Sequence, residues 1–174
     1  MRKPRLLLVD DEKPFVENLL KLLSRRGYEV SAALDGDSAL RLLQEREFDV
    51  VILDQNMPGK DSITLLRELK KIQPRAEVVI LTGYGSVDMA LKGFGLGIYD
   101  YISKPVQLRD LEARIHVIIT QMGGVISVRS EAGKGGEFDI FLPCRGGDSS
   151  GSEQTRRKDS NNELDEKTQA ALGG

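Results

Sequence analysis

The sequence predicts an α/β protein in which five parallel strands alternate with helices, a (βα)5 doubly wound sheet. Short apolar runs recur along the chain, and the segments between them have apolar residues at helical spacing. Strands that are apolar nearly throughout are typical of a parallel sheet covered by helices on both faces. The 174 residues suffice for one such domain and a little more. The five runs are "RLLLV" (5–9), "YEVSAAL" (28–34), "DVVIL" (49–53), "EVVILT" (77–82) and "IYDYI" (98–102).

Helices are expected between these runs, where apolar residues recur every three or four positions. A fourth helix is expected to end near Gly93 and Gly95. Its end should be loose, because each interior glycine costs a helix about 1 kcal/mol relative to alanine. A fifth helix should run from about Gln107 to Met122. The apolar sets of the first three helices are Phe15, Leu19, Leu22 and Leu23; Ala39, Leu42 and Leu43; and Ile63, Leu66 and Leu69.

Residues 122–144 are expected to form a β-hairpin after the fifth helix. Gly123 and Gly124 suit a helix stop. Two runs of alternating apolar residues, "VISVRS" and "EFDIFLP", then flank the turn-rich "EAGKGG". Residues 145–174 contain almost no large apolar side chain, so they cannot bury enough surface to offset their ordering entropy. They are predicted to be a disordered polar tail.

The composition excludes several classes of protein. A net charge of −2 is too small to suggest a nucleic-acid partner or an anionic membrane surface. No apolar run approaches the ~18 residues of a membrane span, and the apolar stretch near the N-terminus is too short for a signal-peptide core. Cys144 is the single cysteine, so neither an internal disulfide nor a multi-cysteine zinc site is expected. These features favour a cytoplasmic protein with no nucleic acid and no membrane as partner.

Chemically active side chains are expected at the carboxyl ends of the strands, where functional groups gather in doubly wound sheets. Three carboxylates there would repel one another, and a hard divalent cation such as Mg²⁺ would relieve that repulsion. One carboxylate could then attack a phosphoryl group, while the metal, an ammonium and a hydroxyl hold the phosphoryl oxygens. In chain order these side chains are Asp10, Asp11, Asp54, Thr82 and Lys104.

Four motifs resemble the receiver domain of bacterial two-component response regulators: "LLLVDDE", "DVVILDQNMPGKD", "VVILTGYGS" and "YDYISKP". The resemblance covers residues 4 to about 121, so the expected receiver domain is 1–121, and it implies a flavodoxin-like strand order 2-1-3-4-5. It also implies that Asp54 is the phosphoacceptor and that Tyr101 is an aromatic switch acting with Thr82. Thr82 and Lys104 would contact the phosphoryl group. The implied metal ligands are Asp10, Asp11, Asp54 and the backbone carbonyl of Asn56.

The function implied by this resemblance is phosphoacceptance. A sensor histidine kinase or a phosphotransfer protein would supply a phosphoryl group to Asp54 with Mg²⁺, and the chain would signal through a conformational or oligomeric change. It would catalyse only its own phosphorylation and dephosphorylation. The alternative is a receiver fragment of a hybrid kinase or a transcription regulator, acting as an interaction module without its own output domain. His116, the single histidine, is interpreted as a helix-surface residue rather than a phosphotransfer group.

The hairpin segment, residues 122–144, resembles the last part of a histidine-kinase ATPase domain. The nucleotide-binding elements that belong upstream in that family are absent, and "AGKGG" lacks the spaced glycine and the Ser/Thr of a phosphate loop, so ATP binding is not expected. Because a lone hairpin is marginal in water, its apolar side must cover the receiver itself, a kinase or a second copy. We favour a homodimer built partly from this hairpin and the fifth helix.

Overall fold

The computed structural model describes residues 1–59, 61–83, 95–131 and 135–144, with the backbone alone described at 128–131 and 135–138. Residues Met1–Cys144 form one compact unit. The predicted fourth helix falls largely in 84–94, and the predicted tail is 145–174, so both lie outside the described residues.

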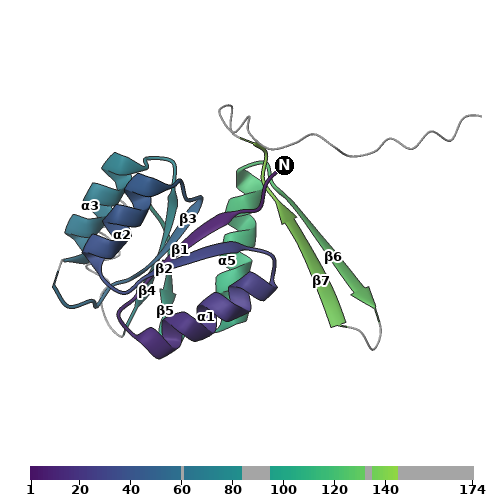
Figure 1. Cartoon of the computed structure of the whole chain (residues 1–174), viewed down its shortest axis with the longest axis horizontal. Coiled ribbons are helices and arrows are strands. Elements are labelled where there is room, and N and C mark those ends of the chain that lie inside the picture. The colour runs from purple at the N-terminus through teal and green to yellow at the C-terminus, as the bar shows by residue number, and fades with distance from the viewer. Residues whose placement is uncertain (60, 84–94, 132–134, 145–174) are drawn as a thin grey trace, which may run out of the picture. The chain divides into compact units, whose positions relative to one another are not determined.

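A five-stranded parallel sheet runs through the centre of this unit (Figure 1). Its order, β2-β1-β3-β4-β5, is the one implied by the sequence. All five residues of β3 are buried, whereas the two edge strands are only partly buried. Helices cover the inner strands on both faces, which explains why their sequences are uninterrupted apolar runs. The strands are β1 (Arg5–Val9), β2 (Glu29–Ala33), β3 (Val50–Asp54), β4 (Glu77–Thr82) and β5 (Ile98–Ser103).

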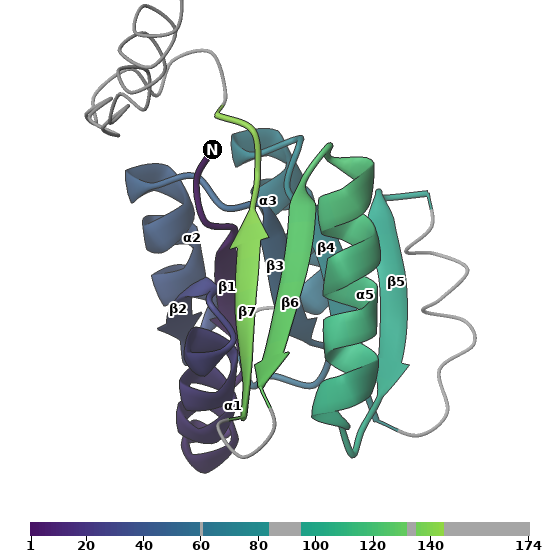
Figure 2. The same cartoon turned by 90° about the vertical axis from the view of Figure 1, so that its right-hand side faces the viewer.

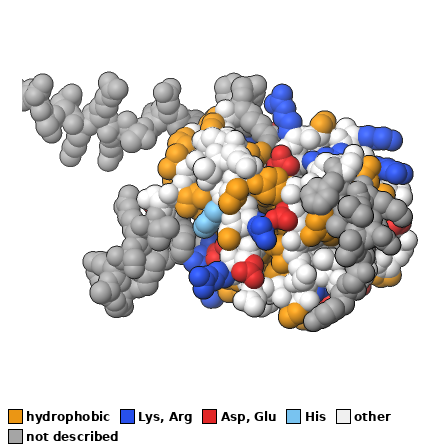
Figure 3. Space-filling view, turned by 180° about the vertical axis from the view of Figure 1, so that it is seen from behind, with side chains coloured by type: hydrophobic (Ala, Val, Ile, Leu, Met, Phe, Trp, Pro, Cys, Tyr) orange, Lys and Arg blue, Asp and Glu red, His pale blue; other side chains and the backbone are white. Residues whose placement is uncertain are grey.

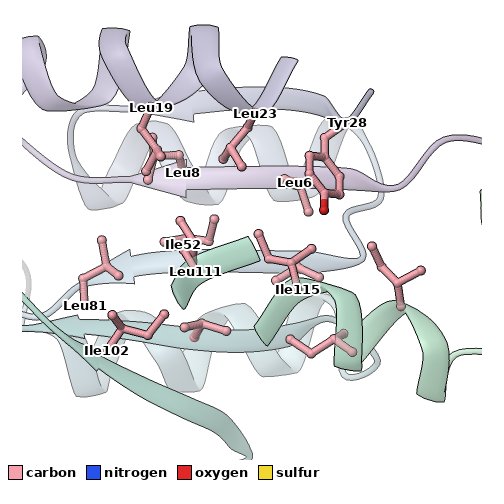
Figure 4. Packing of buried hydrophobic residues seen from close by; sticks show 14 of the residues in the cluster. Leu6, Leu8, Leu19, Leu23, Tyr28, Ile52, Leu81, Ile102, Leu111 and Ile115 are labelled. Carbon is pink, nitrogen blue, oxygen red and sulfur yellow. The ribbon is translucent and has the colours of Figure 1, made fainter. Parts of the chain in front are cut away.

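The helices form a layer on each face of the sheet (Figures 1 and 2). Successive strand residues point to opposite faces, so Leu6 and Leu8 of β1 belong to one hydrophobic cluster and Leu7 and Val9 to the other. The first cluster packs against α1 and α5, as Figure 4 shows, and the second packs against α2 and α3. The helices are α1 (Lys13–Arg25), α2 (Gly36–Glu45), α3 (Ser62–Ile72) and α5 (Leu108–Gln121).

The buried face of α1 differs slightly from the predicted one. Val16, Leu19 and Leu23 are buried, whereas Phe15 and Leu22 are only partly buried. Phe15 instead places its ring beside the ammonium of Lys104, with 5.3 Å between Nζ and the ring centroid. The apolar spacing alone could not distinguish a core phenylalanine from one that borders a charged group.

The predicted hairpin is present, with β6 (Val125–Glu131) paired antiparallel to β7 (Gly135–Phe141). Gly123 has a φ of 77°, a left-handed conformation that ends α5 as the glycine pair predicts. Gly124 has a different role. A Cβ there would lie 2.8 Å from the Ile119 carbonyl oxygen and 2.9 Å from that of Phe141, so only glycine lets the hairpin approach α5 this closely.

The base of the hairpin packs on its own receiver. Ile140 and Leu142 are each 2% exposed and belong to the same cluster as Leu6 and Ile115. The sequence left three surfaces open for the hairpin: the receiver, a kinase or a second copy. The end of the hairpin that carries Ile140 and Leu142 covers the receiver. The side chains of 128–131 and 135–138, further along the strands, lie outside the description.

Arg2 fastens the hairpin to the sheet. Its backbone forms a bridge with Leu142, through N–H···O distances of 2.8 and 2.7 Å. Its guanidinium donates to both carboxylate oxygens of Asp49 at 2.7 Å, and Asp49 also accepts from the N–H of Arg5. Two-pronged pairs of this kind fix orientation as well as position. The start of the chain, β3 and the end of β7 are thus held together.

Replacing Ile140 by alanine should lower the free energy of unfolding by about 2–5 kcal/mol, the usual cost of truncating a buried isoleucine. Urea unfolding followed by circular dichroism measures this change. Leu34→Ala, at a position that is 41% exposed, is the control and should change stability little. Equal and small effects at both positions would contradict the packing of the hairpin on the receiver core.

Candidate functional site

Three carboxylates meet at the carboxyl edge of the sheet. β1 and β3 are neighbouring parallel strands with Val9 opposite Leu53, so the residues that follow, Asp10 and Asp54, lie side by side. Oxygen atoms of Asp10, Asp11 and Asp54 all lie within 4.8 Å of one another. Asp10 and Asp54 are buried, whereas Asp11 is exposed. The acidic cluster predicted from the strand ends is therefore formed.

Lys104 supplies the positive charge for this cluster. Its Nζ lies 2.8 Å from Asp10 Oδ2 and 3.1 Å from Asp54 Oδ1. The backbone N–H of Lys104 donates to the carbonyl of Thr82 at 2.7 Å, which fixes the start of this segment to the end of β4. Burial disfavours the ammonium, but the hydrogen bonds with the carboxylates outweigh it and raise the pKa of Lys104. The side chain therefore stays charged beside the acids.

Asp54 is the carboxylate with the most perturbed surroundings. Burial, the largest effect, raises the pKa of its carboxyl above the ordinary value; the Lys104 ammonium opposes this rise, and the charge of Asp10 adds to it. Although Lys104 Nζ is 3.1 Å from Asp54 Oδ1, this buried oxygen makes no hydrogen bond of good geometry in the described part of the chain. A buried oxygen without a hydrogen bond is suited to accept a cation or to react.

The donor set fits Mg²⁺. The ion prefers oxygen ligands, takes one or two carboxylates together with waters, and pairs with phosphate oxygens. Asp10 and Asp54 provide buried carboxylate oxygens, and the exposed Asp11 leaves one side of the cluster accessible. The oxygen of Asp54 that lacks a hydrogen bond gives such an ion a place to bind.

Thr82, Asn56 and Tyr101 lie around this edge of the sheet. Thr82 ends β4, and its hydroxyl donates to the carbonyl of Gly83 at 2.9 Å. Asn56 follows β3 and is exposed; its backbone N–H hydrogen-bonds the Asp54 carboxylate and acts to lower the pKa of that group. Tyr101 is a partly buried residue of β5 that lines a small apolar pocket with Gln55 and others. Their predicted roles remain predictions.

Two further residues contact Lys104 and were missed from the sequence. Glu12 Oε1 lies 3.2 Å from Lys104 Nζ, and the Phe15 ring lies on another side of the same ammonium. The sequence contained one signal, a third acidic residue directly after Asp10 and Asp11. No periodicity or strand-end rule distinguishes this residue from an ordinary first residue of a helix.

His116 lies away from this site. Its ring packs at a tilt against Tyr28, with 6.5 Å between the ring centroids, and burial lowers its pKa. Tyr28 precedes β2, so the pair lies near the amino edge of the parallel sheet, opposite the edge that carries Asp54. His116 is therefore partly buried and packed, rather than the plain helix-surface residue expected from the sequence. Among the described helices, none has the length and apolar character needed to cross a membrane.

The segment that contains the acidic site matches a known protein family. The model of the response regulator receiver domain matches residues 6–116. The chain belongs to this family. The match covers β1 to most of α5 and thus every residue of the acidic site, but it ends before the hairpin. The resemblance of 122–144 to a histidine-kinase ATPase domain finds no support in the comparisons.

Curated relatives include proteins named transcriptional regulatory protein PrrA from several mycobacteria. The protein from Mycobacterium leprae is 34% identical and the one from Mycobacterium tuberculosis 33%, each over 142 residues. These alignments cover 82% of this chain but 61% of each relative, so the chain spans about three fifths of their length.

Solved structures of receiver domains share the fold. A receiver domain protein from Clostridium thermocellum is 38% identical, with a TM-score of 0.64 over 68% of this chain and 95% of that one. A CheY-like receiver from Methanospirillum hungatei is 28% identical, with a TM-score of 0.66 over 68% and 95% of the two chains. A Burkholderia pseudomallei response regulator, solved with a phosphorylated aspartic acid and a calcium ion, is 28% identical, with a TM-score of 0.61 over 68% and 73%.

Mg²⁺ should raise the midpoint of thermal unfolding of this chain, because an ion that binds only the folded state stabilises it by mass action. At an ion concentration about 100 times the Kd, the gain would be about 2.7 kcal/mol. Differential scanning calorimetry with and without Mg²⁺ measures it.

Asp54→Asn should remove most of this gain. Asp61→Asn is the matched control, since Asp61 caps α3 through the N–H of Thr64 and asparagine can keep that cap. An equal gain in the Asp54 variant, or none in the unchanged chain, would contradict the metal site.

Proposed function

We propose that this chain is a phosphoacceptor receiver whose Asp54 takes a phosphoryl group from a sensor histidine kinase or a phosphotransfer protein in the cytoplasm. The observation that supports this most strongly is the state of Asp54. Its carboxylate is buried, lies 3.1 Å from an ammonium and has an oxygen that makes no hydrogen bond with any described residue. A structural ion pair would satisfy both partners, whereas this oxygen is left available for chemistry.

The proposed reaction is a displacement at phosphorus. A carboxylate oxygen of Asp54 attacks the phosphorus of a phosphohistidine, the P–O bond forms as the P–N bond breaks, and the leaving imidazole keeps the electron pair and takes up a proton. The Lys104 ammonium is close enough to balance charge on the phosphoryl oxygens. Bound Mg²⁺, held by Asp10, Asp11, Asp54 and the carbonyl of Asn56, would supply the remaining positive charge. Later attack by water on phosphorus returns the carboxylate and releases inorganic phosphate.

The proposed signal begins at Thr82. Its hydroxyl donates to the carbonyl of Gly83 and would have to leave that bond to reach a phosphoryl oxygen. Tyr101 lies on β5, which pairs with β4, and lines the small apolar pocket formed with α3. Its ring would turn as Thr82 moves. The same movement would change the surface that a partner contacts.

The proposed assembly is a homodimer that pairs through α5 and the hairpin. Val117 on α5 and Val125 on β6 are 50% and 53% exposed, two of the few large apolar side chains exposed in the described residues. Single exposed apolar residues are common, but here both lie on the two elements that the sequence analysis favoured for pairing. Figure 3 shows one face of the molecule, on which hydrophobic side chains alternate with acidic and basic ones.

A second candidate is the receiver part of a longer transcription regulator. It is favoured by one observation: the curated relatives bear that name, and the chain spans 61% of their length. Asp54 would have the same chemistry in that case, and the output would come from a further domain.

Incubation with acetyl phosphate and Mg²⁺ should add one phosphoryl group to the chain, measured by intact mass spectrometry. Asp54→Asn should abolish the gain, and Asp61→Asn, which removes an exposed carboxylate, should keep it. A wild-type chain that gains no mass would contradict the proposed function.

Light scattering tests the dimer. The unchanged chain should have twice the monomer mass, and the double variant Val117→Glu, Val125→Glu should be a monomer because it places charge in the interface. Leu34→Glu, at another exposed apolar position, serves as the control and should remain dimeric. A monomeric wild-type chain, with and without the phosphoryl group, would refute the dimer.

A further inference from the structure

Glu12 is a carboxylate beside the site to which the proposed function gives no role. It occupies the position before the first turn of α1, yet its side chain makes no capping hydrogen bond. At the same position Asp35 caps α2 and Asp61 caps α3, as short polar side chains usually do. Gln107 before α5 makes no capping hydrogen bond either, so the lack of a cap at Glu12 shows only that its carboxylate is available for another contact.

The Glu12 side chain is directed to Lys104 instead. Glu12 Oε1 and Lys104 Nζ are 3.2 Å apart. The backbone N–H of Glu12 donates to Asp10 Oδ1 at 2.8 Å, while the other oxygen of Asp10 accepts from Lys104. Glu12 is therefore fixed to the buried acid that contacts the same lysine, so its side chain starts from a defined place beside the ammonium.

Phe15 completes the surroundings of this ammonium. Its ring centroid lies 5.3 Å from Lys104 Nζ, close enough for attraction between the cation and the face of the ring. Lys104 thus lies among Asp10, Asp54, Glu12 and an aromatic ring. An ammonium has three N–H donors, and in this state three carboxylates occupy its neighbourhood.

A phosphoryl group on Asp54 would compete for these donors. Asp10 and Asp54 belong to the reacting site, so their contacts with Lys104 would change when the phosphoryl group arrives. Glu12, with 64% of its side chain exposed, lies outside that site and would keep its contact with Lys104. We propose that Glu12 is a positioning residue that, together with Phe15, holds Lys104 in its resting place and thereby slows phosphorylation of Asp54. This inference rests on the proposed function.

Glu12→Asp is the discriminating variant, because it keeps the negative charge but shortens the side chain by one methylene and withdraws it from Lys104. The rate of phosphorylation by acetyl phosphate with Mg²⁺, followed by intact mass, should rise about two- to fivefold, the effect of losing a partly exposed ion pair. Glu12→Ala should produce a rise at least as large. Glu17→Asp, on the same helix and paired with Lys13, is the control and should leave the rate unchanged.

The charge of Glu12 could act on an anionic donor without any contact. In that case Glu12→Ala would accelerate the reaction while Glu12→Asp behaved like wild type, and this result would overturn the proposal. An unchanged or lower rate in both variants would also overturn it.

A second measurement separates this inference from the proposed function. The Cε resonance of Lys104 in lysine-labelled chain senses the Phe15 ring and needs no phosphodonor. In Glu12→Asp it should shift away from its wild-type value, and in Glu17→Asp it should not. Failure of the proposed function would appear as a wild-type chain that gains no phosphoryl group. Failure of the inference would appear as an unchanged Lys104 resonance and an unchanged rate in a chain that is phosphorylated.

Discussion

Repulsion between carboxylates at one edge of the sheet, balanced by the ammonium of Lys104, is the constraint on which the site depends. Asp10 and Asp54 are buried on neighbouring strands, and two buried charges of the same sign are costly without a partner. Lys104 supplies that partner from the segment after β5, at the far side of the sheet. The balance therefore requires β1, β3, β4 and β5 in this order, so the chemistry depends on the whole topology and not on a local motif.

The burial of the inner strands explains how the side chains at their carboxyl ends are held in place. The three inner strands are fully or almost fully buried between two helical layers, and the residues that end them inherit fixed positions. The partly buried edges carry the elements expected to move: Tyr101 lies on β5 rather than on an inner strand. The buried acids and Tyr101, the residue proposed as the switch, thus lie on neighbouring parts of one sheet.

Much of this could be predicted from the sequence, because buried parallel strands are continuous apolar runs and their ends gather at one edge. The acidic cluster and Lys104 follow from that rule alone. The contacts of Glu12 and Phe15 do not follow from it, since nothing in the helical spacing shows that these side chains meet Lys104, which comes 92 residues after Glu12. The pairing of Arg2 with Asp49 was missed for the same reason. For the hairpin, the alternation of apolar residues predicted an apolar side but not which of the three possible surfaces it covers.

The bridge between Arg2 and Leu142 places the first residues of the chain beside the last residues of the compact unit. When the two ends of a chain lie close together, the fold depends less on the order in which its strands are connected than on the contacts between them. A short peptide could join residue 144 to residue 1, and the chain could be opened between the exposed Arg46 and Glu47, after α2, while Asp10 and Asp54 stay side by side. The hairpin would then enter the middle of the rearranged chain, and its strands would become internal elements of the fold instead of a terminal extension.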